Sequence, residues 1–296
     1  LIHPNGEEMA AVEVALADET ASFESLAGAE SAIAMSSSRI GEDGAELLRG
    51  AGLGDPRNTD AETIAALDGL LVLVHPSNPV RAVSISELAQ IYAGESTNWS
   101  QIGGLNVDIA VYAREQGSGT MNAFDSLVMA PSGFELGSGV EVIGSNDDLS
   151  DTVTSDPAGI GIAPFAYRRA ARVMPIRQDC GIVSFPTEFA IKTEEYPLSR
   201  RLYLYQGGGN QPAHATRLVE FARTGEAAPY VRDAGFVSLA PGSEGLDTQG
   251  LRLAYSITSQ QEFSLPLMQE MLRDFEGAER LSTTFRFTPG SSQLNA

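Results

Sequence analysis

The residue types best suited to binding chemistry are concentrated in one stretch, Arg114-Glu115-Gln116-Gly117-Ser118-Gly119-Thr120. Gly117 and Gly119 let the backbone come close to a ligand, while the hydroxyls of Ser118 and Thr120 can donate hydrogen bonds. Arg114 adds a planar, charged fork that matches two oxygens of an anion. The pattern predicts an oxyanion site. The alternative is a glycine turn capped by Thr120, with Arg114 paired to a surface carboxylate.

A run of three serines is the second candidate. Ser36, Ser37 and Ser38 directly follow a predicted strand at residues 32–35 and precede a predicted helix at residues 45–49. Hydroxyls at a strand end can turn toward the same ligand. Serine runs are also common in loops that bind nothing, so both interpretations stay open.

Two hydroxyls at the start of the first predicted helix are the third candidate. Thr20 and Ser22 stand where such side chains ordinarily act as helix N-caps. Asp18 and Glu19 are their neighbours, and these carboxylates would repel an anion unless they point away.

The composition excludes several classes of function. Nineteen basic and thirty-nine acidic side chains give a net charge of −20, which disfavours nucleic acid and anionic membranes as partners. A bound anion must therefore be held by local donors. The longest apolar run, residues 69–74, is much shorter than a membrane span, so we expect a soluble chain. The first residue is Leu rather than Met, which indicates a processed or trimmed chain.

No pattern typical of catalysis or cofactor binding is visible. His3, His75 and His214 are scattered without the spacing of metal ligands, and no Ser/His/Asp order or Walker loop occurs. The single cysteine, Cys180, cannot form an intramolecular disulfide and is expected to be an inert thiol. We therefore expect a binding protein, without cofactor or metal, and not an enzyme.

The elements that must position these residues follow an alternating pattern. Strand-like and helix-like stretches alternate through the first half, which predicts a parallel α/β sheet; they are residues 12–16, 22–27, 32–35, 45–49 and 69–74. Pro76 and Pro79 then indicate a crossover between lobes. Beyond it we predict a helix at 88–92 with a capping box at Ser84 and Glu87.

The candidate anion loop itself lies between a predicted strand at 107–113 and a predicted helix at 121–129. Such a loop leaves backbone N–H groups unpaired at the helix start, where the helix dipole favours negative charge. Further predicted elements are a helix at 147–153, strands at 160–162, 201–205 and 235–239, and a helix at 216–223. After these, residues 251–257 and the segment around Phe285 and Phe287 are predicted strands that flank a helix at 267–275.

Several separated segments together resemble the phosphate-binding proteins of phosphate ABC transporters. They include Val-His-Pro-Ser-Asn-Pro-Val at residues 74–80, the stretch 88–104 with Thr-Asn-Trp-Ser-Gln-Ile-Gly-Gly, and the loop 114–120. The likeness continues through residues 159–162, 196–205 and 234–237 and thus covers about residues 12 to 240.

The resemblance implies an α/β, two-lobed type II periplasmic-binding-protein fold with hinge crossovers. One lobe would comprise residues 1–76 and 196–240, and the other residues 77–195. A linker at 241–250 and a C-terminal segment at 251–296 would follow. The family's opening strand, with its phosphate-contacting loop, has no counterpart before residue 12, so we expect that strand to be missing.

The resemblance also implies a function and a location. A phosphate ion would be captured in the periplasm for transport or sensing, with an ABC permease as a partner. The residues that carry over from the family's R-x-x-G-S-G-T loop are Arg114, Ser118, Gly119 and Thr120, and the serine run maps onto Ser36, Ser37 and Ser38.

Two departures from the family keep other ligands open. Several family members have an aspartate near the serine run, which accepts the proton of hydrogen phosphate, and no aspartate stands near Ser36–Ser38 here. Gln116 occupies a position where a carboxylate often partners the arginine, although Glu115 can substitute. Sulfate or another phosphorylated small molecule is therefore an alternative ligand.

A ligand-free envelope scaffold is the second alternative. Residues 282–294, Ser-Thr-Thr-Phe-Arg-Phe-Thr-Pro-Gly-Ser-Ser-Gln-Leu, resemble the opening strand of an OmpA-like domain. The resemblance implies attachment to peptidoglycan in a Gram-negative cell envelope.

Overall fold

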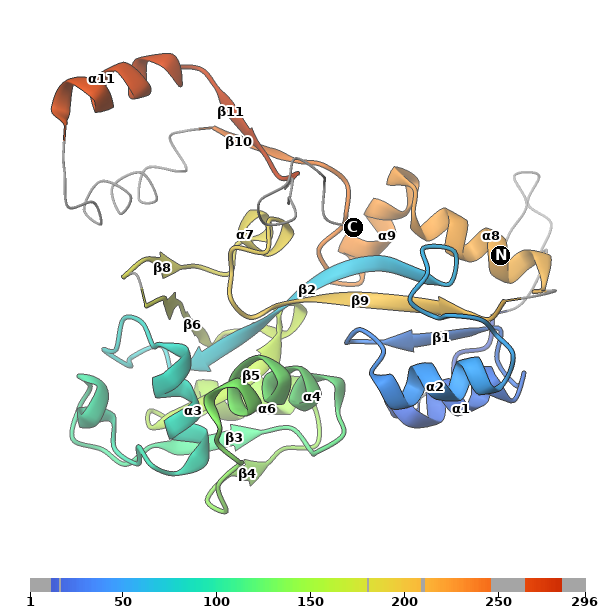
Figure 1. Ribbon diagram of the computed structural model, residues 1–296. Coiled ribbons are helices and arrows are strands. Elements are labelled where there is room, and N and C mark those ends of the chain that lie inside the picture. The colour runs from blue at the N-terminus through green and yellow to red at the C-terminus, as the bar shows by residue number, and fades with distance from the viewer. Residues whose placement is uncertain (1–11, 16, 180, 209–210, 246–263, 284–296) are drawn as a thin grey trace.

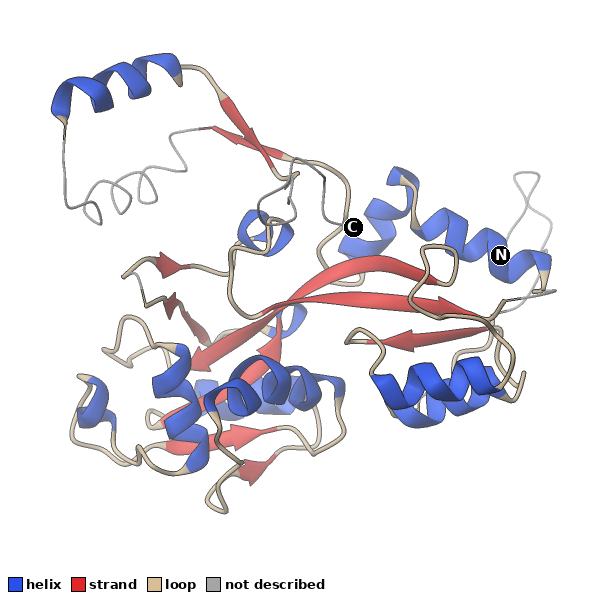
Figure 2. Ribbon diagram, in the orientation of Figure 1, coloured by secondary structure: helices blue, strands red, loops and turns tan. Residues whose placement is uncertain are grey.

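A mixed sheet of seven strands organises the chain (Figures 1 and 2). The computed structural model describes residues 12–15, 17–179, 181–208, 211–245 and 264–283. The strands follow the order β1-β9-β2-β5-β3-β4, and β6 pairs with the end of β2 on the edge opposite β5. The strands of this sheet are β1 (Ile33–Ser36), β2 (Glu62–Val74), β3 (Ala110–Ala113), β4 (Glu141–Val142), β5 (Gly159–Pro164), β6 (Arg172–Met174) and β9 (Ser199–Gln206).

Strand β2 runs through the whole molecule and changes partner midway. Over Glu62–Gly69 it pairs antiparallel with β9, and from Leu70 to Val74 it pairs antiparallel with β5. Its second half is apolar throughout, because side chains alternate between faces and both faces are covered. Leu71 and Leu73 belong to one core cluster. Leu70, Val72 and Val74, whose side chains point to the other face, belong to another. The partner change divides the sheet into two lobes that share one continuous strand.

The lobe containing β1 packs helices on both faces of the sheet (Figure 1). Helices α1 (Glu19–Ala27) and α2 (Glu42–Gly50) lie on one side, and α8 (Ala213–Ala222) and α9 (Ala228–Asp233) on the other. The core between the sheet and the first pair is small and includes Phe23, Leu26, Ala34, Leu48 and Tyr205.

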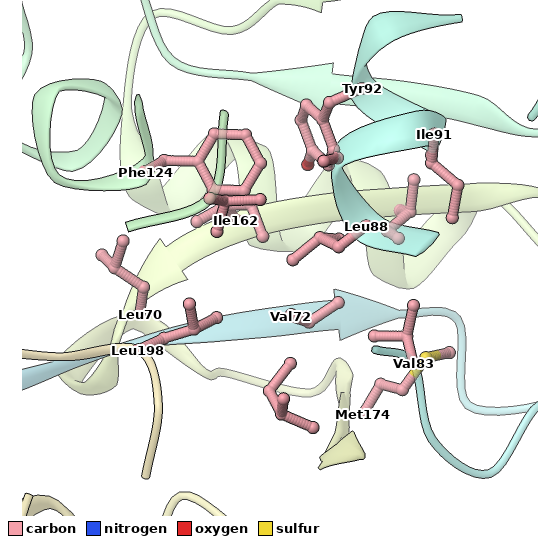
Figure 3. Close-up of a cluster of buried hydrophobic side chains, with 14 of the residues drawn as sticks. Leu70, Val72, Val83, Leu88, Ile91, Tyr92, Phe124, Ile162, Met174 and Leu198 are labelled. Atoms are coloured by element: carbon pink, nitrogen blue, oxygen red, sulfur yellow. The ribbon is translucent and has the colours of Figure 1, made fainter. Parts of the chain in front are cut away.

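The lobe containing β3 holds the larger core (Figure 3). Helix α3 (Ile85–Ala93) begins at Ser84, which forms the predicted capping box with Glu87, and ends at Gly94 in the left-handed conformation. Tyr92 of this helix packs against Phe124, with ring centroids 4.5 Å apart. The remaining helices of this part are α4 (Gly119–Phe124), α5 (Ala130–Ser132), α6 (Asn146–Ser155) and α7 (Glu188–Lys192), with a π-helix, η2 (Asp125–Met129), between α4 and α5.

Three strand predictions differ from the structure. The first half was expected to form a parallel sheet, yet β1 and β2 both pair antiparallel with β9, which lies between them. Among the described strands of this sheet, the parallel pairs are those of β3 with β5 and with β4. Residues 12–15 are irregular and exposed rather than a strand, because no neighbouring strand pairs with them. The strand expected at 235–239 is reduced to one bridge between Val237 and Leu67.

In the C-terminal part, the helix at residues 265–274 stands away from the lobes (Figure 1), whereas Arg280 pairs with Glu195 beside α7. Strand β10 (Ser243–Gly245) pairs with β11 (Glu279–Leu281), so three residues of the predicted linker are in fact a short strand. Helix α11 (Leu265–Asp274) matches the predicted helix within two residues at its start. The strands predicted at 251–257 and around Phe285 lie outside the described residues, as does Cys180.

None of the helices in the described part of the chain combines the length and the hydropathy that a membrane span requires.

Truncation of a fully buried leucine tests the shared role of β2. Leu73 is completely buried where β2 meets β5, so Leu73→Ala should lower the free energy of unfolding by about 2–5 kcal/mol. Leu105→Ala is the matched control, because Leu105 is 62% exposed, and it should change stability by no more than about 0.5 kcal/mol. Urea unfolding followed by circular dichroism measures both. Equal losses in the two variants would contradict the assigned core.

Candidate functional site

The predicted anion loop connects β3 to α4. Gly117 has a φ of +86°, a left-handed conformation that glycine adopts without strain, and it turns the chain into the helix. Ser118 is the N-cap of α4, and its Oγ accepts a hydrogen bond from the Met121 amide at 3.3 Å. The cap is thus Ser118, not Thr120, which is buried in the first turn. A hydroxyl that accepts one bond still has its own proton to donate to a ligand.

Arg114 is held by the next residue in the chain. Its Nε and Nη2 donate to the two carboxylate oxygens of Glu115, at 3.1 and 2.6 Å. These hydrogen bonds stabilise the ionised carboxylate and lower the pKa of Glu115 below its usual range. The Arg114 side chain is 13% exposed, whereas that of Glu115 is half exposed. Glu115 therefore takes the partner role that Gln116 cannot fill.

The serine run lies at the end of β1, and two of its hydroxyls are directed at Glu19 of α1. The Ser36 hydroxyl shares its proton between the Ser38 carbonyl at 2.8 Å and the Glu19 carboxylate at 3.0 Å, and Ser38 donates at 3.0 and 3.1 Å to the two carboxylate oxygens. The Ser36 Oγ also accepts the Ser38 amide at 3.2 Å. Glu19 therefore points at the serine run, rather than away from it. Sequence reasoning treated this residue only as a source of repulsion.

The third candidate pair does not form the helix cap. Asp18 caps α1, because its carboxylate accepts the Ala21 amide at 2.8 Å. Ser22 donates to the Met35 carbonyl at 3.4 Å, and Thr20 is exposed on α1.

The middle serine reaches across to the other lobe. Ser37 Oγ donates to the Gly119 carbonyl at 3.4 Å, although 82 residues separate the two. A Cβ placed on Gly119 would lie 2.9 Å from the Ser37 Oγ, so a larger residue at position 119 would force Ser37 to shift. The structure thus brings together two of the loops that the sequence singled out.

Arg200 and Asp68 complete this contact, and neither was among the predicted site residues. Asp68 is completely buried, and its Oδ2 accepts from Nε and Nη2 of Arg200 at 2.9 and 2.7 Å. The Nη1 of Arg200 donates to the Gly119 carbonyl at 2.5 Å. The neighbouring Arg201 is ion-paired as well, with Glu194. A lone carboxylate within an apolar strand was the signal that could have found Asp68, because a buried charge needs a partner.

A cleft of about 490 Å³ opens beside this contact. Both lobes contribute to it, and most of its polar groups are hydroxyls and guanidinium groups. Its lining includes Ser37, Ser38, Ser126, Ser199, Arg39 and Arg200. The loop residues Arg114, Gly117, Ser118 and Thr120 and the helix residues Thr20 and Ser22 do not line it.

Within the described ranges, no group of three or more His, Cys, Asp or Glu side chains is arranged to hold a metal ion.

Comparison with known proteins identifies the fold. The Phosphate-binding protein PstS of Borreliella burgdorferi is 23% identical over 188 residues, which cover 60% of this chain and 66% of that protein. An ABC-type phosphate transport receptor from Vibrio cholerae matches the structure with a TM-score of 0.62 and 24% identity, over 74% of this chain and 84% of the receptor. A substrate-binding protein from Clostridium perfringens, solved with bound phosphate, matches with a TM-score of 0.60 and 23% identity over 74% and 83%.

The family match covers most of the chain. A family described as the PBP superfamily domain matches residues 6–223, a range that contains β1 to β9 and the loops described above. The match and the solved structures confirm the predicted two-lobed α/β fold. The chain belongs to the PBP superfamily.

Proposed function

We propose that this chain captures inorganic phosphate between its two lobes and acts by binding and release, not by catalysis. The observation that carries the proposal is the meeting of Ser37 with Gly119, because it joins a hydroxyl-rich strand end to the start of a helix across the lobes. Backbone N–H groups in the first turn of a helix have no partner within that helix and favour an anion. The relatives described above, which are phosphate-binding proteins by name, support this ligand.

Five of the predicted residues have a role that their geometry allows. Arg114 keeps its Nη1 for a ligand while Nε and Nη2 hold Glu115. Ser118 offers a hydroxyl proton, and Gly119 and Thr120 offer backbone N–H groups at the helix start. Ser37, from the opposite lobe, would turn its single hydroxyl proton from the Gly119 carbonyl to an anion in the cleft.

Glu19 favours phosphate over sulfate. The family's aspartate is missing from the serine run, but the carboxylate of Glu19 lies within hydrogen-bond distance of Ser36 and Ser38. At neutral pH phosphate retains a proton that it can donate in a hydrogen bond to a carboxylate, whereas sulfate has no such proton. The same carboxylate would repel a fully ionised anion.

The setting of the protein is part of the proposal. A periplasmic receptor that hands phosphate to an ABC permease fits the family, and the lobes would comprise residues 1–76 with 196–240, and 77–195. The C-terminal segment, whose helix α11 stands apart from the lobes in Figure 1, is proposed to lead into an OmpA-like peptidoglycan-binding domain. Its support is the sequence of residues 282–294, of which only Ser282 and Thr283 are described.

Calorimetric titration of phosphate tests the ligand and the site together. Phosphate should bind the protein and sulfate should not. Arg114→Ala should weaken phosphate binding by roughly 10- to 100-fold, because it removes a charge-assisted hydrogen bond of about 1.5–3 kcal/mol. Arg169→Ala is the matched control, since Arg169 is paired with Asp147 and Asp151 at the surface, and its affinity should equal that of the unchanged protein.

The other outcomes are equally informative. If sulfate binds more tightly than phosphate, then sulfate is the ligand and the proposal of phosphate is wrong. Absence of heat with both anions, together with no thermal stabilisation by either, would sink the proposal and favour an envelope scaffold. If phosphate is the ligand, a phosphate concentration of 100 times the Kd should stabilise the folded protein by about 2.7 kcal/mol.

A double-mutant cycle tests whether the two lobes meet at Gly119. Gly119→Ala should weaken phosphate binding, because its Cβ would crowd Ser37 Oγ. Ser37→Ala removes the crowded atom, so the double variant should bind more tightly than additive losses predict, with a coupling of about 0.5–3 kcal/mol. Ser126→Ala, which changes another serine of the same cleft, is the control and should combine additively with Gly119→Ala. Additivity in both pairs would mean that the loops do not touch in solution.

A further inference from the structure

Asp68 and Arg200 lie where the chain passes between the lobes. They are directly opposite each other in the antiparallel pairing of β2 with β9. One residue after Asp68, β2 leaves β9, and from Leu70 onward it pairs with β5. The Leu70 amide still donates to the Leu198 carbonyl at 2.9 Å, so both strands cross between the lobes at this level.

The Asp68 carboxylate ties three segments together. Its Oδ1 accepts the Gly69 amide at 2.8 Å and the Phe165 amide, just beyond the end of β5, at 3.2 Å. Its Oδ2 accepts both hydrogen bonds from Arg200. Four donors on one buried carboxylate fix the position of the guanidinium, because a buried charge without such bonds costs several kcal/mol.

The third guanidinium nitrogen, Nη1, is not bound to Asp68 and reaches the other lobe. Arg200 Nη1 donates to the carbonyl of Gly119, the first residue of α4. The peptide unit that joins Gly119 to Thr120 is planar, with its N–H directed opposite to its carbonyl. Fixing the carbonyl therefore fixes the direction of the Thr120 N–H, one of the donors assigned to the anion.

We propose that Arg200 is a positioning residue that couples the lobe crossover to the anion loop. Anchored on Asp68 in the strands, it holds the Gly119 peptide in the orientation that binds an anion and holds the lobes together around the ligand. This inference rests on the proposed phosphate binding. Ser37 contributes a second and longer bond to the same carbonyl.

The adjacent arginine provides the matched comparison. Arg201 lies one residue further along β9, so its side chain points to the opposite face of the strand and pairs with Glu194. Its chemistry and its place in the cleft wall are similar, but no hydrogen bond from Arg201 to α4 is found in the described part of the chain. A conservative change at either residue keeps the positive charge.

The test compares Arg200→Lys with Arg201→Lys. A lysine at position 200 has a single ammonium group, which can pair with Asp68 but cannot also reach Gly119 as the fork does. Without ligand, amide hydrogen exchange of residues 117–124 should be about tenfold faster in Arg200→Lys and unchanged in Arg201→Lys. With phosphate, stopped-flow measurement should show koff about tenfold higher in Arg200→Lys and kon within about threefold, because the contact acts after the anion has entered.

Three results would overturn the assignment. They are unchanged exchange at residues 117–124 in folded Arg200→Lys, equal effects in the two variants, and a loss confined to kon. If Arg200→Lys does not fold, Asp68→Asn/Arg200→Gln replaces the buried charges with neutral amides and should show the same faster exchange and faster phosphate release. The exchange experiment needs no ligand, so a failure of phosphate binding and a failure of the positioning role give different results.

Discussion

The buried carboxylate of Asp68 is the constraint on which the arrangement of the lobes depends. Strand β2 belongs to both lobes, and a charge at its crossing point must find donors or destabilise the fold. The donors come from β9, from the segment after β5 and from β2 itself, so one side chain defines where the lobes are joined. Two nitrogens of Arg200 bind Asp68, and this pairing fixes the position of the guanidinium. Its third nitrogen, Nη1, therefore reaches the other lobe at a fixed place, the Gly119 carbonyl.

The anion site follows from this geometry in a protein of strongly negative charge. With a net charge of −20, long-range electrostatics repel an anion, and salt weakens that repulsion. Affinity must therefore come from directed donors at short range. The donors that we propose come from two separate segments, the serine run after β1 and the loop before α4. Arginines in the cleft are each balanced by a carboxylate, as Arg39 is by Glu62, which leaves orientation rather than net charge to select the ligand.

Local sequence patterns predicted local structure well and strand neighbours poorly. The capping box at Ser84 and Glu87 and the left-handed Gly94 are encoded within a few residues, so both ends of α3 are marked in the sequence, although the helix begins at Ile85 rather than at the predicted residue 88. The position of β9 between β1 and β2 could not, because β9 comes more than 120 residues after β2 in the chain. An alternating pattern alone therefore suggested a parallel sheet. The candidate anion loop at residues 114–120 was likewise singled out by its glycines and Arg114, whereas the contact of Glu19 with the serine run and that of Arg200 with Gly119 exist only after folding.

A crystal structure of the phosphate complex tests the central claim most directly, namely that loops from both lobes clamp one tetrahedral anion. The account predicts density for a single phosphate within hydrogen-bond distance of Ser37 on one side and of Ser118, the Thr120 amide and Arg114 on the other, with Arg200 still bound to the Gly119 carbonyl. An anion bound by only one lobe, or one that displaces Arg200 from Gly119, would contradict it.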